Sequence, residues 1–339
     1  MPQQSKPIYL LAIESSCDDT SAAVFRNDEN LANLVANQDI HRQFGGVVPE
    51  LASRAHLQNI IPVVDNALKT AGITLDQLDA VAFTRGPGLI GSLLVGATFA
   101  KGLALTLGIP LIEVNHMQAH VLAHFIEDPK PSFPFLCLTV SGGHTQIVLV
   151  RSHLDMEVIG TTTDDAAGEA FDKTAKILGL PYPGGPLIDK YAQTGNPKAF
   201  GFGKPKVEEL NFSFSGFKTS VLYAVQKQQK LDNEFINNHL PDLCASIQRH
   251  IIEMLMEKLE LAAKQHNIKE IAISGGVSAN SGLRTAITVT GQRLGWNTYI
   301  PRFEYCTDNA AMIGITAYYK FLKGEFTTQD VGAVARYEL

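Results

Sequence analysis

The sequence predicts an α/β protein built from two similar lobes that face each other across a cleft. Apolar stretches of strand length alternate with longer stretches of helical periodicity along the 339 residues. A strand, a polar or glycine-rich turn and a second strand occur at residues 8–25 and again at 134–152. The Pro-rich segment 128–134 separates the two copies, as expected of a boundary between lobes. Such a duplication indicates two related α/β lobes.

The first half is expected to alternate strands and helices. Residues 8–16 form an apolar run that ends at acidic residues, which is typical of a buried strand. Between residues 47 and 72, apolar side chains recur at helical spacing, and Gly72 ends the predicted helix. The other predicted elements are strands at 20–26, 31–39, 78–85 and 110–115, and helices at 88–108 and 116–128.

The second half repeats this alternation with longer helices. A helix is predicted at 164–179, with Asp164 and Asp165 as candidates for its N-cap and Gly179 at its end. The other predicted elements are strands at 134–140 and 145–152, a long amphipathic helix at 241–266, a strand with a glycine turn at 269–280, and a last helix at 307–324.

Composition and charge exclude several classes of protein. The formal net charge of −6 argues against a free-standing nucleic-acid-binding protein, which would usually be basic, and we expect no DNA partner. The four cysteines show neither a disulfide framework nor zinc-finger spacing, which favours a reducing compartment. The N-terminus does not resemble a signal peptide, and no apolar stretch approaches the length of a membrane span. We therefore expect a cytoplasmic protein with no membrane partner.

Two histidines four residues apart indicate a metal site. His116 and His120 share one face of the predicted helix and could chelate one divalent ion. Met117 stands where zinc proteases carry a glutamate, so proteolysis by an activated water lacks its base. Asp308, at the start of the last helix, is the candidate third ligand. His124 lies about 80° around the helix from His116 and is expected to pack. The alternative is a core helix with structural histidines.

Two glycine pairs, in "TVSGGHTQ" (139–146) and "ISGGVSAN" (273–280), each follow an apolar strand. Glycines allow the backbone to approach a ligand and to point N–H groups at an anion. Matching loops in two lobes favour a nucleotide, with its phosphates on one loop and its adenosine on the other. A simple tight turn is the alternative for either loop alone.

Two further patterns need an explanation. "GPGLIG" (86–91) matches the dinucleotide fingerprint of dehydrogenases, but Pro87 removes a backbone N–H from that loop, so we interpret the glycines as a turn with close helix packing.

Glu14, Asp18 and Asp19 gather at the end of the first strand, where they would repel a phosphate. These carboxylates imply a metal, a cationic group or a catalytic task.

Nine motifs together resemble one known family. "ESSCDDTS", "GGVVPELASRAH", "TRGPGLIGSLLVG", "NHMQAH", "VSGGHTQ", "DDAAGEAFDKTAKILGLPYPGGP", "FSFSGFKT", "SGGVSAN" and "CTDNAAMIG" follow one another across nearly the whole chain. In this order they resemble the bacterial tRNA N6-adenosine threonylcarbamoyltransferases, the TsaD family. The resemblance implies a duplicated two-lobe actin-like (ASKHA-type) fold with a central nucleotide and metal cleft. We assign residues 1–115 with 308–339 to the first lobe and 116–307 to the second.

The resemblance also implies a reaction and partners. The threonylcarbamoyl group of threonylcarbamoyl-adenylate would pass to the exocyclic amine of the adenosine 3′ to the anticodon, in tRNAs reading codons that begin with A, and AMP would leave. One divalent metal, Fe²⁺ or Zn²⁺, would act as a Lewis acid, and ATP or AMP would also fit the cleft. The expected partners are tRNA, a TsaB-type paralogue and a TsaE-type ATPase. The helix at 50–68 would be the partner surface, although its apolar stripe is equally typical of a core-facing helix.

The family's site residues map onto this sequence by motif. The metal ligands correspond to His116, His120 and Asp308. In archaeal relatives a tyrosine also binds metal, and Thr139 stands at the matching position, so that ligand is not carried over. We propose Asp19 as acceptor of the amine proton, with Asp18 and Glu14 in support. The adenylate contacts correspond to Thr139, Val140, Ser141, Gly142, Gly143, Asp172, Gly185, Asp189 and Asn280.

Two other classes of protein remain as alternatives. A small-molecule kinase of the same actin-like architecture would need an aspartate base in a sugar pocket and has no use for the three metal ligands. A non-catalytic scaffold, like the paralogous partner, should lack those ligands altogether. A zinc protease is less favoured than either because the glutamate is missing.

Overall fold

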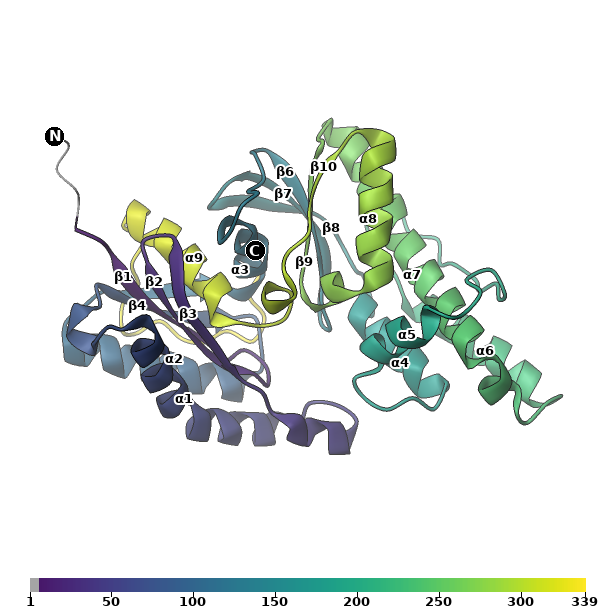
Figure 1. The fold of residues 1–339 in the computed structure, drawn as a ribbon, viewed down its shortest axis with the longest axis horizontal. Coiled ribbons are helices and arrows are strands. Elements are labelled where there is room, and N and C mark those ends of the chain that lie inside the picture. Colours follow the sequence, from purple (N-terminus) through teal and green to yellow (C-terminus); the bar gives the residue numbers. More distant parts are fainter. Residues whose placement is uncertain (1–5) are drawn as a thin grey trace. The chain divides into compact units, whose positions relative to one another are not determined.

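The computed structural model describes residues 6–339, which form two compact units (Figure 1). Unit 1 comprises residues 6–130, the short segment His153–Met156, and Thr307–Leu339. Unit 2 comprises Pro131–Ser152 and Glu157–Cys306. Each unit has its own sheet and its own apolar core.

The sheet of unit 1 has the strand order β3-β2-β1-β4-β5. The strands are β1 (Tyr9–Glu14), β2 (Thr20–Arg26), β3 (Glu29–Ala36), β4 (Ala80–Gly86) and β5 (Leu111–Asn115). β1, β2 and β3 pair antiparallel, whereas β1, β4 and β5 pair parallel. Parallel neighbours require crossover connections, and helices α1 (Pro49–Ala71) and α2 (Ile90–Leu107) make them.

Helices cover both faces of this sheet (Figure 1). α1 and α2 pack on one face, where Ile60 and Val64 of α1 share an apolar cluster with alternate residues of the central strands. α9 (Ala310–Lys323) packs on the other face, so closely that a Cβ on Gly314 would lie 2.4 Å from the Phe25 ring. α3 (His116–Leu122) follows β5 directly and packs against α9. Short 3₁₀ turns complete the unit: Asp39–Phe44, Leu75–Gln77 and Ala123–Phe125.

Unit 2 repeats the sheet of unit 1 with the strand order β10-β9-β6-β7-β8. The strands are β6 (Phe135–Val140), β7 (Thr145–Ser152), β8 (Asp155–Thr161), β9 (Glu270–Ser274) and β10 (Asn297–Tyr299). As in unit 1, the first strand pairs antiparallel with the second and parallel with the fourth. The helices are α4 (Ala167–Ile177), α5 (Gly184–Ala192), α6 (Ser215–Gln229), α7 (Phe235–His266) and α8 (Ser281–Leu294), with 3₁₀ turns at Gly276–Ala279 and Phe303–Tyr305. The predicted duplication is confirmed.

The boundary between the units differs from the expected one. Residues 116–130 were expected to open the second lobe, but they belong to unit 1. The reason is that α3 continues from β5 and packs against α9, and both of these elements belong to unit 1. Asp308 belongs to unit 1 as well, so one unit contains all three predicted metal ligands.

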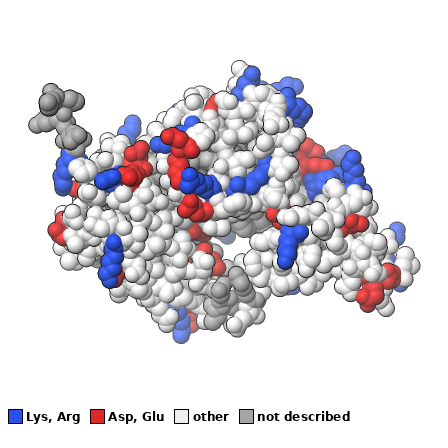
Figure 2. Space-filling view, viewed as in Figure 1, with Lys and Arg blue, Asp and Glu red and all other residues white. Residues whose placement is uncertain are grey.

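α2 also departs from expectation. It is long and apolar enough to cross a membrane by length and composition, although a core helix passes the same test. Leu93, Ala97 and Ala100 of this helix are buried where it packs against β4 and α1, whereas Ile90, Leu94 and Leu105 are exposed. On the face shown in Figure 2, basic and acidic side chains are interspersed. The described residues include exposed ion pairs, such as Lys204 with Glu257.

Candidate functional site

The end of β5 sets the position of both histidines. Asn115 is the N-cap of α3, and its Oδ1 accepts hydrogen bonds from the backbone N–H groups of Met117 (2.8 Å) and Gln118 (3.1 Å). The helix therefore starts at His116, and His120 follows one turn later on the same face. His116 and His120 are 7% and 0% exposed.

The start of α9 sets the position of Asp308. Asn309 caps this helix, because its Oδ1 accepts from Met312 N at 3.1 Å. Side chains from the sheet bind the next two backbone N–H groups: Ser21 Oγ accepts from Ala310 N (2.8 Å) and Asn33 Oδ1 from Ala311 N (3.1 Å). Asp308 directly precedes this anchored cap, so its carboxylate is fixed above β2.

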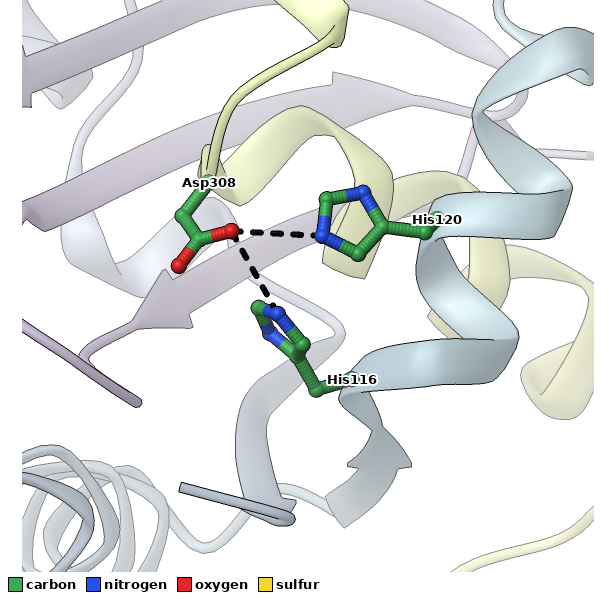
Figure 3. Close-up of side chains that lie close together, drawn as sticks. All are labelled: His116, His120 and Asp308. Atoms are coloured by element: carbon green, nitrogen blue, oxygen red, sulfur yellow. Dashed lines mark hydrogen bonds and ion pairs between the residues drawn. The ribbon is translucent and has the colours of Figure 1, made fainter. Parts of the chain in front are cut away.

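The three predicted ligands converge on one point (Figure 3). Oδ1 of Asp308 lies 3.2 Å from His120 Nε2 and 3.4 Å from His116 Nε2. One ligand atom from each residue lies within 4.8 Å of the other two. Two imidazole nitrogens and one carboxylate oxygen form a donor set that suits Zn²⁺ or Fe²⁺ and leaves further coordination positions open. The residues therefore fit the divalent metal that the resemblance implies.

Glu14 lies behind His116 as its second partner. Oε2 of Glu14 is 3.1 Å from His116 Nδ1, and the Ser16 hydroxyl is 3.2 Å from the same nitrogen. Glu14 is fully buried and also accepts from the Thr84 hydroxyl at 2.6 Å. A carboxylate on the far nitrogen of a metal-binding histidine fixes the orientation of the ring. Glu14 therefore orients the His116 ring, and its support of Asp19 stays a prediction.

The buried cluster shifts the pKa values of its members in opposite directions. Burial alone would lower the pKa of His116, but the charges of Asp308 and Glu14 outweigh burial and raise that pKa well above its usual value. Burial dominates for His120 and lowers its pKa. Attraction to His116 holds the pKa of Asp308 below its usual range despite its burial. Without a metal, His116 is thus the protonated partner of two carboxylates.

The acidic turn after β1 lies beside this cluster. Burial, together with the charges of Asp18 and Asp308, raises the pKa of the Cys17 thiol, so Cys17 stays protonated and is a poor nucleophile. Asp18 and Asp19 are half-buried in the turn between β1 and β2. His56 of α1 spans this turn: its Nε2 donates to Cys17 O at 3.0 Å, and its Nδ1 contacts the Thr20 hydroxyl at 2.7 Å. This role of His56 was not predicted, because it joins residues that lie far apart in the sequence.

Unit 2 contains a cavity of about 260 Å³ between its two glycine loops and helices α4 and α5. Five of the nine predicted adenylate contacts line it: Gly142, Asp172, Gly185, Asp189 and Asn280. Seven further residues line it that were not predicted as contacts, although all of them lie within the family motifs: Gly168, Phe171, Pro183, Pro186, Gly276, Val277 and Ala279.

The polar residues of this cavity also hold its walls together. Asp172 Oδ1 accepts from the backbone N–H groups of Gly184 (2.8 Å) and Gly185 (3.1 Å) at the start of α5, and burial raises its pKa. Asp189 accepts from the hydroxyl (2.6 Å) and the N–H (3.0 Å) of Ser281. Asn280 caps α8. The cavity is thus built around helix N-termini, which favour anions.

Four predicted adenylate contacts are not among the residues that line this cavity. Thr139 and Val140 are fully buried at the end of β6, and the Thr139 hydroxyl lies 3.0 Å from Ser274 Oγ. Ser141 closes a tight turn, because its Oγ accepts from His144 N at 3.1 Å. Gly143 is exposed in the same turn. The side chains of Thr139 and Val140 are therefore enclosed in unit 2, and the predicted contact of all four residues with the adenylate stays a prediction.

The glycines of "GPGLIG" provide close packing, as the sequence analysis interpreted them. A Cβ on Gly88 would lie 2.4 Å from Ser16 O, and one on Gly86 would lie 2.0 Å from Val334 O. The loop is therefore filled by other parts of unit 1 and does not form a dinucleotide site.

Comparisons with known proteins agree with these features. The family described as "TsaD: tRNA N6-adenosine threonylcarbamoyltransferase" matches residues 29–315. A protein of that name from Christiangramia forsetii is 63% identical over 98% of both chains. Others are 61% identical in Riemerella anatipestifer (98% of this chain, 99% of the relative) and 49% identical in Clostridium botulinum (98% of both chains). The resemblance found from the nine motifs is confirmed.

Solved structures of low sequence identity share the fold alone. A full-length HypF structure superposes with a TM-score of 0.63 at 12% identity, over 94% of this chain and 47% of that one. Component A of the (R)-2-hydroxyglutaryl-CoA dehydratase from Acidaminococcus fermentans gives a TM-score of 0.54 at 15% identity, over 92% and 98%. These likenesses confirm the predicted two-lobe actin-like architecture.

Proposed function

Because the chain belongs to the tRNA N6-adenosine threonylcarbamoyltransferase family, we propose that it transfers a threonylcarbamoyl group from threonylcarbamoyl-adenylate to tRNA. The acceptor is the exocyclic amine of the adenosine 3′ to the anticodon, in tRNAs that read codons beginning with A. The convergence of His116, His120 and Asp308 carries this proposal, since the kinase and scaffold alternatives have no use for a buried His/His/Asp cluster. We also propose a cytoplasmic location, since tRNA is the substrate of this reaction.

His116, His120 and Asp308 would hold one divalent metal, Fe²⁺ or Zn²⁺. When bound, the ion supplies Lewis-acid chemistry at a carbamoyl or phosphate oxygen. Glu14 keeps the His116 ring turned toward the ligand position through the 3.1 Å contact at Nδ1. The open coordination positions leave room for a substrate oxygen.

The transfer itself requires no nucleophile from the protein. The amine nitrogen of adenosine attacks the carbamoyl carbon, a C–N bond forms, and the C–O bond to the phosphate breaks and releases AMP. The amine proton needs an acceptor, and Asp19 in the acidic turn is our candidate. The protonated Cys17 thiol in the same turn offers no competing covalent route.

The cavity of unit 2 would bind the adenylate. Its helix N-termini and the exposed Gly142 favour the phosphate, and an added Cβ at Gly142 would meet no protein atom within 4 Å. The other loop, at Gly276 to Asn280, would hold the adenosine. ATP or AMP would fit the same cavity.

The partners of this reaction would be tRNA, a TsaB-type paralogue and a TsaE-type ATPase. α1 supports a paralogue-binding surface, because Leu57 and Ile61 are each 64% exposed while Ile60 and Val64 face the core. Leu94 of the adjacent α2 is 50% exposed. These three side chains, which we call the α1/α2 apolar face, are the surface we assign to the paralogue.

A reconstitution tests the proposed reaction. The purified chain, loaded with metal, is mixed with threonylcarbamoyl-adenylate and unmodified tRNA, with and without the two partner proteins. Mass spectrometry of the digested nucleosides should show threonylcarbamoyl-adenosine, and His116→Ala should abolish it. Failure of the wild-type chain to modify tRNA, with metal and both partners present, would move the assignment to the kinase or scaffold alternative.

A further inference from the structure

The helix that carries both histidines is too short to be stable alone. α3 has seven residues, and isolated helices shorter than about 12 residues are marginal in water. Its position therefore depends on tertiary contacts, both along its side with α9 and at its N-terminal end. Asn115 supplies the contact at the N-terminal end, where its Oδ1 accepts two backbone N–H groups.

The other end of the Asn115 side chain binds a distant segment. Nδ2 donates to the carbonyl oxygens of Tyr337 at 3.4 Å and Glu338 at 3.0 Å. Asn115 is 8% exposed, so water has little access to replace these bonds. An aspartate at this position would still cap α3 but could not donate to either carbonyl. One amide group thus ties the metal-binding helix to residues 337 and 338.

Residues 332–338, which we call the strap, are fixed along the end of β4. Val334 N donates to Arg85 O at 2.9 Å, and Ala335 O accepts from Gly88 N at 3.1 Å. The close approach of Val334 O to Gly86 leaves no room for a side chain there.

The Arg85 guanidinium fixes both ends of the strap. It donates to Gly332 O at 3.1 Å and to Glu113 at 2.7 Å, and it lies 4.9 Å from the centroid of the Tyr337 ring. A guanidinium over an aromatic face is held by a cation–π attraction. The strap is therefore an ordered part of unit 1, and the carbonyls that Asn115 binds have a defined position.

We propose that the strap positions the metal centre by fixing Asn115 and, through it, the axis of α3. This inference rests on the metal site of the proposed function. Loss of the strap would let α3 tilt while its cap remains, so that His116 and His120 no longer meet Asp308 in the geometry the metal needs. Tyr337 and Asn115 are thus positioning residues that lie outside the ligand set.

Three variants and a matched control test the role of the strap. Asn115→Asp keeps the cap and removes both donations, whereas Tyr337→Ala removes the ring that Arg85 holds. Tyr337→Phe keeps that ring but removes the hydroxyl contacts with Glu113 (3.3 Å) and Arg85 (3.4 Å), so its effect should be smaller than that of Tyr337→Ala. Arg336→Ala is the control, because Arg336 is exposed in the same segment. Zn²⁺ affinity is measured by chelator competition, ligand geometry by the visible absorption of the Co²⁺-loaded protein, and α3 opening by hydrogen exchange of the metal-free protein.

We expect Asn115→Asp and Tyr337→Ala to lose roughly tenfold or more in Zn²⁺ affinity, as changes behind the metal ligands usually do. Both should alter the Co²⁺ spectrum and speed exchange at residues 116–122, with strand β1 unchanged as a check on folding. If the wild-type chain binds metal, and both variants keep its Zn²⁺ affinity and its Co²⁺ spectrum, this inference fails while the proposed function stands. A wild-type chain that binds no metal would overturn the metal centre of the proposed function and this inference with it.

Discussion

His116 and His120 occupy equivalent positions one turn apart, but their surroundings give them different roles. Both nitrogens of His116 face carboxylates, whereas Nδ1 of His120 is buried without a hydrogen-bond partner among residues 6–339. The pKa of His116 is accordingly raised and that of His120 lowered. Metal binding must therefore displace a proton from His116, while His120 is already neutral and ready to coordinate.

Glu14→Gln tests the orientation of His116. The amide has the same shape but carries no charge, so it holds the imidazole more weakly than the carboxylate does. We expect Zn²⁺ affinity to fall by about 10–100-fold, the usual cost of losing a partner behind a metal ligand. Chelator competition measures the change. Glu29→Gln, in an exposed ion pair with Arg26, is the matched control and should bind Zn²⁺ like wild type.

His56 provides a test of stability against pH in the metal-free protein. Burial lowers the pKa of this ring below its usual 6.5, so the folded state favours the neutral form. As pH falls below about 6.5, His56 becomes protonated in the unfolded chain but stays neutral in the folded one. The free energy of unfolding therefore decreases until the pKa of His56 in the folded state is reached. His116 contributes with the opposite sign, because its raised pKa adds stability at low pH that is lost as pH rises.

Comparison of variants separates the His56 contribution from that of the other histidines. Urea unfolding of wild type and His56→Asn is followed between about pH 7 and pH 5. The variant should be less stable at pH 7, because Cys17 O and the Thr20 hydroxyl lose their partner, and its stability should fall less toward pH 5. A parallel pH dependence in the two proteins would refute this role. His266→Asn, at an exposed position, is the control.

The sequence predicted the three residues that converge as a candidate metal site, but not the residues that support them. The spacing of His116 and His120 is local and visible, and the family motif supplied Asp308. Glu14 was noticed only as one acid among three, because its contact with His116 joins residues 102 positions apart. Nothing in a single sequence shows which of three neighbouring carboxylates is buried.

At the scale of elements, α1 has two apolar faces that the sequence could not separate. Leu57, Ile60, Ile61 and Val64 all fit one helical stripe in the sequence. In the structure Ile60 and Val64 pack into the core, whereas Leu57 and Ile61 are exposed. A helix of an α/β unit needs only one buried face, so the second apolar face requires another explanation.

Charge placed on the α1/α2 apolar face should block assembly with the paralogue. Leu57→Glu or Ile61→Glu puts an unpaired carboxylate into the expected interface. Each change should cost at least about 2 kcal/mol of binding free energy, or roughly 30-fold in affinity, as central interface residues do. Sedimentation of the chain with the TsaB-type protein measures the loss. Val289→Glu, at an exposed position of α8, is the control and should bind normally.

Helix starts show where local rules fail. Asp164 and Asp165 were expected to cap α4, but the N-cap is Ala166, which makes no side-chain hydrogen bond. Asp164 instead accepts from Phe214 N (2.7 Å) and Ser215 N (3.2 Å) at the start of α6, some 50 residues away. Tertiary contacts as well as local sequence decide which helix a capping residue serves. Asp164 is a typical capping residue, but it binds the N–H groups at the start of α6 and not those of α4.

At the scale of the whole molecule, the duplication was predictable because each copy begins with the same strand, turn and strand. The partition of the chain was less predictable, since the expected boundary at residue 116 separated α3 from the β5 strand that positions it. The observed partition places all three candidate metal ligands in unit 1 and every residue that lines the glycine-loop cavity in unit 2. Each unit thus supplies one of the two binding functions that the proposed reaction requires.

This division predicts that metal and nucleoside binding can be lost separately. His116→Ala should reduce Zn²⁺ affinity by more than the ~10–100-fold of a change behind a ligand, and should leave adenosine affinity unchanged. Gly276→Ala should weaken adenosine binding and leave Zn²⁺ affinity unchanged. An added Cβ at Gly276 meets no protein atom within 4 Å, so the new methyl group would contact only a ligand in the cavity. We expect it to weaken adenosine binding roughly tenfold.

Calorimetric titrations of both variants with Zn²⁺ and with adenosine measure the four affinities. Adenosine is the right probe because it lacks the phosphate and so reports on unit 2 alone. Gly201→Ala is the matched control, since that glycine is also open to solvent but does not line the cavity. Weakened adenosine binding in His116→Ala would mean that the two binding functions are coupled, and the assignment of one function to each unit would then fail.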